Sequence, residues 1–166
     1  MSKMSATDNA TNHHTYFADP VLNALTHEVI TTFGELPEIV PANEGDFFGS
    51  LCESIISQQL STKVADVITA RVKTVVGGSW IPEAVLQTDY ELLKGAGLSG
   101  SKVNYIQNVA TAWSTGSVDP QHLTSAEPEE VITQLVQIKG VGRWTAEMFL
   151  IFTLGKTDVF SAGDYG

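Results

Sequence analysis

The sequence has few thiols and imidazoles and no long apolar run, and each scarcity excludes a class of protein. Its single cysteine, Cys52, cannot form an internal disulfide or supply a four-cysteine metal site. The four histidines show no His-x-x-x-His spacing, which argues against a catalytic zinc site. No apolar run approaches the roughly 20 residues of a membrane helix, and the polar start lacks the apolar stretch of a signal peptide. We therefore expect a cytoplasmic protein without a membrane partner.

Basic residues are scarce as well. Nine lysines and arginines against 19 aspartates and glutamates give a net charge of −10. The basic residues are spread along the chain, and only one of them precedes residue 47. This balance is typical of a solvated acidic surface and, taken alone, argues against a nucleic-acid partner. A DNA-binding protein of this composition would have to rely on backbone amides and helix ends more than on lysines.

The apolar residues that are present, 43% of the 166, are enough for one packed domain. After a lead-in at residues 1–18 that we expect to be disordered, helical spacing predicts one all-α domain over residues 19–166. Cys52 lies on an apolar stripe and is expected to be a buried thiol. Only residues 158–161 alternate in the manner of a strand. Helices are predicted over residues 21–33, 48–59, 64–75, 89–94, 103–113 and 128–135, from Pro82, and from Arg143 or Trp144 onward.

Two glycines interrupt the helical pattern in the segment LVQIKGVGRWTA, residues 135–146. They permit a tight turn and the close approach of another backbone. The first amides of the helix that follows lack intrahelical partners and suit a phosphate oxygen. The Gly-Val-Gly sequence alone favours an ordinary connection between two helices, whereas the full segment is much more specific.

The full segment, with Asp164 twenty residues after Trp144, resembles the helix-hairpin-helix DNA glycosylases, and most of all the 3-methyladenine DNA glycosylase II group. The segments IISQQLS at residues 55–61 and GLSGSK at residues 97–102 match in the same order. The resemblance runs from about Phe47 to the last residue. It implies the all-α glycosylase fold and a monofunctional enzyme that excises alkylated purines from duplex DNA in base excision repair.

The resemblance assigns catalysis to Asp164. Cleavage of an N-glycosidic bond builds positive charge on the deoxyribose, which a carboxylate beneath the sugar stabilises while it orients or deprotonates water. Without the resemblance, Asp164 would be a turn or cap residue, because glycines surround it.

The base pocket is assigned to Trp144 and Met148. Related bifunctional glycosylases carry a Schiff-base lysine at the position of Trp144, and an indole cannot form an imine, so no strand cleavage is expected. The indole can stack on a flipped, positively charged purine, although core packing is the alternative role. Met148 replaces an aromatic residue of the family, which leaves the preferred base open.

Double-stranded DNA with damaged bases is the partner that the resemblance implies. Gln59 matches the residue that fills the gap left by the flipped base. Lys102 has two open roles, a phosphate contact or a structural one at a helix start. A monovalent cation is implied at the carbonyls of Val136, Ile138 and Val141, and no other cofactor is expected. The full set of expected DNA contacts is Gln59, Leu60, Ser61, Lys102, Lys139, Gly140, Gly142, Arg143 and Thr145.

Two departures from the family carry further expectations. The chain stops two residues past Asp164, so we expect a glycosylase truncated before its closing helices, or else a non-catalytic DNA-binding fragment of one. The family's Pro-Val before Gly-Asp is Ser161-Ala162 here, which predicts a less rigid loop. The expected location is the cytoplasm, in association with the bacterial nucleoid, and no obligate protein partner is evident.

Overall fold

The computed structural model describes residues 18–34 and 40–163. The predicted lead-in, apart from Ala18, and the predicted catalytic Asp164 therefore lie outside the described residues. The chain divides into two compact units, Met1–Glu38 and Ile39–Gly166. The single domain proposed for residues 19–166 stays a prediction.

Helix α1 (Pro20–Phe33) belongs to the first unit. The Asp19 carboxylate caps it by accepting from the amides of Val21 and Leu22, and a proline opens its first turn. None of its residues is buried. The predicted helix over residues 21–33 is thus present, but its apolar stripe is not part of a core within the described residues.

All regular secondary structure in the described part of the second unit is helical, which confirms the all-α class. Asp158 lies in a turn and residues 159–161 have no regular secondary structure, so the suggestion of a strand was wrong. An isolated strand has no neighbour to satisfy its backbone groups. No helix in the described ranges is long and apolar enough to cross a membrane. The elements are a 3-10 turn (Glu44–Asp46), α2 (Phe47–Ser57), α3 (Thr62–Val75), α4 (Pro82–Gln87), α5 (Tyr90–Gly95), α6 (Gly100–Ser114), α7 (Pro120–Ser125), α8 (Pro128–Leu135) and α9 (Arg143–Phe152).

Local sequence signals set most of the helix starts. Prolines occupy the first turn of α4, α7 and α8, where the missing amide proton costs nothing. Ser99 caps α6 by accepting from the amide of Lys102 at 3.3 Å. Helix α7 has six residues, of which Leu123 is buried, and it was not predicted. Its capping residue Asp119 was the signal that could have found it.

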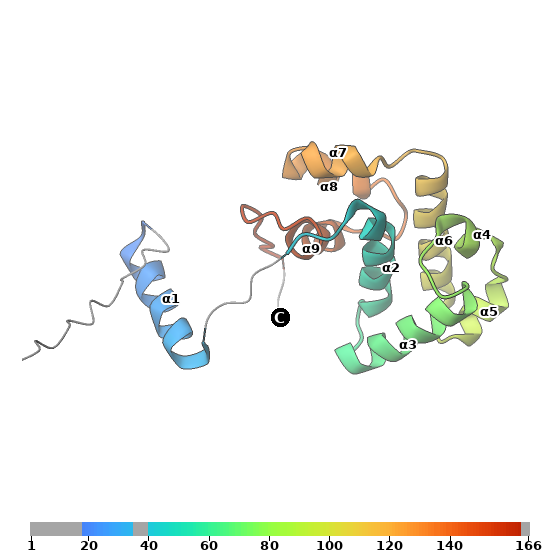
Figure 1. Ribbon diagram of the computed structural model, residues 1–166, viewed down its shortest axis with the longest axis horizontal. Helices are drawn as coiled ribbons and strands as arrows, with labels where there is room; N and C mark the ends of the chain where they lie inside the picture. Colours follow the sequence, from blue (N-terminus) through green and yellow to red (C-terminus); the bar gives the residue numbers. More distant parts are fainter. Residues whose placement is uncertain (1–17, 35–39, 164–166) are drawn as a thin grey trace, which may run out of the picture. The chain divides into compact units, whose positions relative to one another are not determined.

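Helix α2 is the centre of the second unit and contacts α3, α6 and α9 (Figure 1). Leu51, Ile55 and Ile56 are fully buried on it, and Phe47 packs edge-on against Phe149 of α9 with ring centroids 5.7 Å apart. Cys52 is a buried free thiol, as predicted, and burial raises its pKa well above the ordinary range. Because α2 packs directly on α9, the residues that follow α2 lie beside the start of α9.

Candidate nucleic-acid interface

The hairpin, residues 139–142, is a tight turn between α8 and α9. The Val141 amide donates to the carbonyl of Ile138 at 2.9 Å and closes the turn. Gly140 has φ +111°, and a Cβ there would collide with the Cβ and Cγ of Tyr105. Gly142 differs, since its φ is an ordinary −87° and no atom lies within 4 Å of a Cβ built on it. The fold therefore requires glycine at 140 but not at 142.

Helix α9 begins directly after the hairpin, with Gly142 as its N-cap and no side chain capping it. Trp144 is 40% exposed in its first turn, so core packing is not its role within the described residues. Met148, one turn later, is half-buried. The Thr145 side chain is 2% exposed, so a contact of this residue with a phosphate would have to come from its amide.

The 58–61 loop connects α2 to α3 and lies against α9. The Gln58 Nε2 atom donates to the Thr145 Oγ1 atom at 3.1 Å, across 87 positions of sequence. Gln59, Leu60 and Ser61 are exposed, with Leu60 37% exposed. Two of the predicted DNA-contact segments, far apart in the sequence, are thus adjacent in the fold.

Lys102 is engaged within the protein. Its Nζ donates to the carbonyl oxygens of Ile56 at 2.7 Å and of Gln58 at 2.8 Å. These carbonyls belong to the C-terminal end of α2, where an ammonium group is favourable because the last carbonyls of a helix lack amide partners. The Lys102 side chain is therefore hydrogen-bonded at the end of α2. The two roles expected for it, a phosphate contact and a structural one, stay predictions.

The Arg143 side chain is also directed to protein groups rather than left free for DNA. Its guanidinium pairs with both carboxylate oxygens of Glu129, and its Nε donates to the Glu147 Oε1 atom at 2.9 Å. The hydrogen bonds from Arg143 lower the pKa of Glu129. Glu147 is 7% exposed, and its Oε2 atom accepts from the Ser161 hydroxyl at 2.6 Å. The loop expected to be less rigid is therefore attached to α9 at Ser161.

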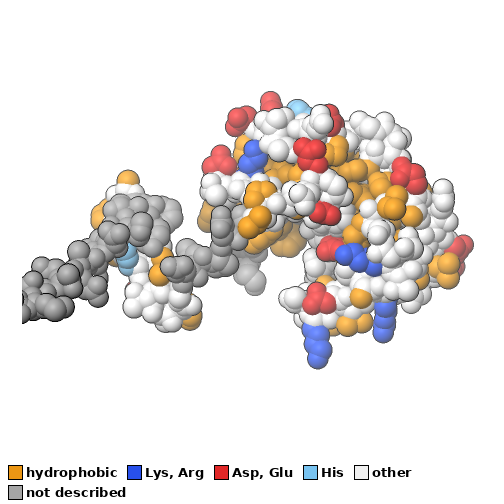
Figure 2. Space-filling view, viewed as in Figure 1, with side chains coloured by type: hydrophobic (Ala, Val, Ile, Leu, Met, Phe, Trp, Pro, Cys, Tyr) orange, Lys and Arg blue, Asp and Glu red, His pale blue; other side chains and the backbone are white. Residues whose placement is uncertain are grey.

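The cationic groups left for an anion are few. Of the described lysines and arginines, Lys63, Arg71 and Lys139 make no side-chain ion pair or hydrogen bond. Lys139 lies in the hairpin and Lys63 lies two residues after Ser61; both are exposed. Sequence reasoning missed Lys63, although its position next to the 58–61 loop was a usable signal. On the face shown in Figure 2, lysine and arginine side chains are few and scattered, and two of them project from the lower edge of the domain.

The described residues contain no group of three histidine, cysteine, aspartate or glutamate side chains that could hold a metal ion. The predicted cation ligands are main-chain carbonyls instead. Ile138 accepts one hydrogen bond, from Val141, and a carbonyl oxygen has a second lone pair. Neutral oxygen donors suit a hard cation such as a monovalent ion, so the donor set of Val136, Ile138 and Val141 fits.

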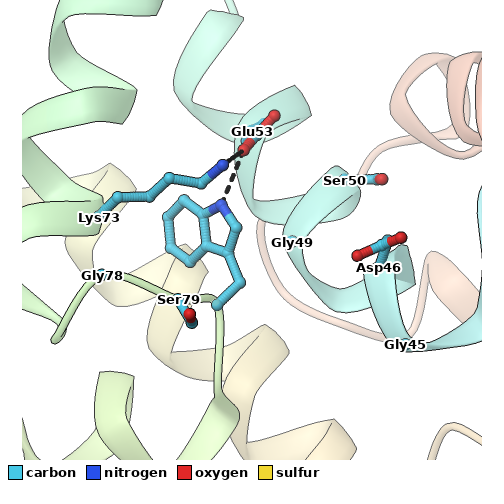
Figure 3. A pocket seen from close by; sticks show the side chains of 9 residues that line it. Gly45, Asp46, Gly49, Ser50, Glu53, Lys73, Gly78 and Ser79 are labelled. Atoms are coloured by element: carbon cyan, nitrogen blue, oxygen red, sulfur yellow. Dashed lines mark hydrogen bonds and ion pairs between the residues drawn. The ribbon is translucent and has the colours of Figure 1, made fainter.

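A pocket of about 500 Å³ lies away from the hairpin, between α2, the end of α3 and the loop that precedes α4 (Figure 3). Its Glu53 carboxylate accepts from the indole of Trp80 at 2.7 Å and pairs with Lys73 at 2.8 Å. A Cβ at Gly49 would lie 2.6 Å from the Trp80 ring, so this helix face is shaped to receive the indole. None of the predicted site residues lines this pocket, and its one lysine is paired with Glu53.

The comparisons with known proteins agree on a family. Residues 52–166 match the model of the HhH-GPD superfamily of base excision DNA repair proteins. DNA-3-methyladenine glycosylase 1 of Schizosaccharomyces pombe is 35% identical over 120 residues, which cover 70% of this chain and 53% of that protein. The chain spans about half the length of the curated relatives it matches.

Solved structures show the same fold. A DNA-3-methyladenine glycosidase from Bacillus halodurans superposes with a TM-score of 0.74 at 40% identity, over 88% of this chain and 66% of that one. The S. pombe 3-methyladenine DNA glycosylase Mag1, solved in complex with abasic DNA, superposes with a TM-score of 0.76 at 31% identity. That match covers 84% of this chain and 69% of the other.

Proposed function

The chain belongs to the HhH-GPD superfamily of base excision DNA repair proteins, and we propose that it is a monofunctional DNA N-glycosylase. Its substrate is duplex DNA that contains an alkylated purine of the 3-methyladenine type, as for the 3-methyladenine DNA glycosylase II group. The relatives named above are 3-methyladenine glycosylases, and one of them was solved on abasic DNA. Both facts support this substrate class.

The observation that carries the proposal is the hydrogen bond between Gln58 and Thr145. It joins the 58–61 loop, which would fill the gap in the base stack, to the helix that follows the hairpin. An enzyme that extrudes a base needs these two functions side by side, because the flipped nucleotide must be both replaced in the duplex and held outside it.

The chemistry follows from three side chains. The indole of Trp144, exposed at the first turn of α9, stacks on the flipped cationic base, with Met148 beside it. The carboxylate of Asp164 stabilises the positive charge that develops on the deoxyribose and orients the attacking water. Because no lysine occupies position 144, the sugar is not captured as an imine and the strand stays intact.

The hairpin binds the phosphate backbone in this proposal. The amides at the start of α9 point at a phosphate oxygen, and Gly140 and Gly142 let the backbone approach. A monovalent cation held by the carbonyls of Val136, Ile138 and Val141 would add positive charge at that phosphate. Lys139 is the side-chain cation available in the hairpin itself.

The test is base release from methylated duplex DNA. We expect free base and an intact strand that contains an abasic site, with no covalent adduct on borohydride treatment. Asp164→Asn should lower the single-turnover rate about 100-fold or more, while the Kd for abasic duplex stays within about twofold.

Three outcomes would contradict the proposal. Near-normal release by the Asn variant would remove Asp164 from the mechanism, and a trapped adduct would contradict the monofunctional reaction. DNA binding without any release of base would indicate a non-catalytic DNA-binding protein instead.

A further inference from the structure

Lys102 is half-buried, and its ammonium group donates to two backbone carbonyls at the end of another helix. Both acceptors, Ile56 and Gln58, lie more than 40 positions away in the sequence. Burial lowers the pKa of the ammonium, whereas the two carbonyls favour its charged form. The contact fixes the main chain at the point where α2 ends and the 58–61 loop begins.

The same loop is held from a second side. The side chain of Gln58 donates to Thr145, which is buried on α9. The main-chain carbonyl of Gln58 is therefore bonded to Lys102 of α6, and its side-chain carboxamide is bonded to Thr145 of α9. Its neighbours Gln59 and Leu60 are exposed, so the anchored residue supports two that are free to enter a duplex.

The backbone of the loop is strained at Gln59. Among the described residues, it is the one non-glycine residue with a positive φ, at +58°. Such a conformation persists only where neighbouring contacts hold it, and it is often found at functional sites. The amide of Leu60 donates to the carbonyl of Ser57 at 3.0 Å and closes the strained turn.

We propose that Lys102 is a positioning residue that keeps the 58–61 loop in the conformation that enters the duplex. The inference rests on the proposed function, because it needs a chain that recognises a lesion by filling the base stack. A loop that is already formed loses little conformational freedom on binding, which favours the lesion complex. Lys102 would thus act through the loop without touching DNA.

The experiment compares the full chain with its Lys102→Met variant, which removes the charge and keeps the length. The Kd is measured for an abasic duplex and for an undamaged duplex, together with the fluorescence of 2-aminopurine placed opposite the lesion. We expect the abasic Kd to rise about tenfold and the fluorescence increase to be lost. The Kd for undamaged duplex should change less than about twofold.

Two further variants make the comparison specific. Lys94→Met removes the same charge from an exposed lysine whose pairing with Glu91 is 4.0 Å long, and it should leave both Kd values unchanged. Thr145→Val removes the acceptor of the Gln58 side chain and should likewise raise the abasic Kd and abolish the fluorescence increase. It tests the anchoring of the loop independently, in case Lys102→Met does not fold. The melting temperature of each variant is measured alongside.

The possible results separate the hypotheses. Equal weakening of abasic and undamaged duplex by Lys102→Met would show a phosphate contact and overturn the inference. A lower melting temperature with an unchanged ratio of the two Kd values would show a merely structural role and also overturn it. If the unmodified chain did not prefer the abasic duplex, the proposed function would fail, and the role of Lys102 with it.

Discussion

Gly140 and Gly142 lie in one turn, yet different forces require them. Gly140 has a positive φ and lies against the Cβ and Cγ atoms of Tyr105, so the fold itself excludes a side chain there. Gly142 has an ordinary φ and open space around it. If glycine is needed at 142, the reason must be a molecule that the folded chain does not contain.

Alanine substitution separates these two reasons. Gly140→Ala should destabilise the fold by about 2–4 kcal/mol, because it combines a collision with an unfavourable φ. Gly142→Ala should cost only about 1 kcal/mol, which is the loss of a glycine N-cap, since the methyl group meets no atom and φ is ordinary. Its methyl group should nevertheless weaken binding to damaged and undamaged duplex equally, by about tenfold, because it blocks the approach of a phosphate.

The measurements are chemical denaturation and fluorescence anisotropy with labelled duplex. Gly95→Ala is the control, because a Cβ at Gly95 also meets no atom within 4 Å and lies on a different helix. Unchanged DNA affinity of Gly142→Ala would mean that the hairpin does not touch DNA.

Single residues also show where sequence reasoning stops. The roles expected for Lys102, Arg143 and Thr145 stay predictions, and the partners of their side chains within the fold were not foreseen. The acceptors of Lys102 lie 44 and 46 positions away, and the donor to Thr145 lies 87 away. Spacing along a chain cannot reveal such contacts, because they depend on how α2, α6 and α9 pack together.

At the scale of elements, prediction succeeded where the signals are local. Helical periodicity, first-turn prolines and capping residues lie within one or two turns of the helices they define, and these helices were found. Helix α7 is the exception, because it was missed although its cap Asp119 and its first-turn proline are local signals as well. Residues 158–161 were misjudged because alternation alone does not supply the neighbouring strand that a sheet requires.

The loop after α9 has a testable connection to catalysis. Ser161 donates to the buried carboxylate of Glu147 and lies three residues before the predicted catalytic Asp164. Ser161→Ala should leave one oxygen of Glu147 without its hydrogen bond and lower the free energy of unfolding by about 1–2 kcal/mol. Because the loop loses this anchor, we also expect the single-turnover rate of base release to fall about tenfold, with the Kd for abasic duplex unchanged.

Glu129→Gln is the matched control, since it weakens the exposed pair with Arg143 but leaves the contact between Ser161 and Glu147 in place. It should alter neither rate nor stability appreciably. A Ser161→Ala variant that releases base at the normal rate would show that this hydrogen bond does not position Asp164.

At the scale of the whole molecule, the acidic charge must be reconciled with a DNA partner. The net charge is −10, and most described cations are already engaged. Lys73, Lys94 and Arg143 pair with glutamates, whereas Lys102 and Lys156 donate to backbone carbonyls. Three cationic side chains are left in the described residues: Lys63, Arg71 and Lys139. Neutral amides and a bound cation would therefore have to supply much of the contact with phosphate.

This distribution predicts a shallow dependence of DNA affinity on salt. Each phosphate neutralised by a lysine or arginine contributes about −0.9 to the slope of log K against log salt concentration. Three available cations limit the slope for undamaged duplex to about −3, measured by anisotropy between about 50 and 200 mM salt. Lys139→Met should make the slope less steep by about one, because it removes the hairpin cation. Lys73→Met should leave it unchanged, because Lys73 is paired with Glu53. A slope near −6, or no response to Lys139→Met, would mean that engaged lysines are released to the DNA or that DNA binds another face of the chain.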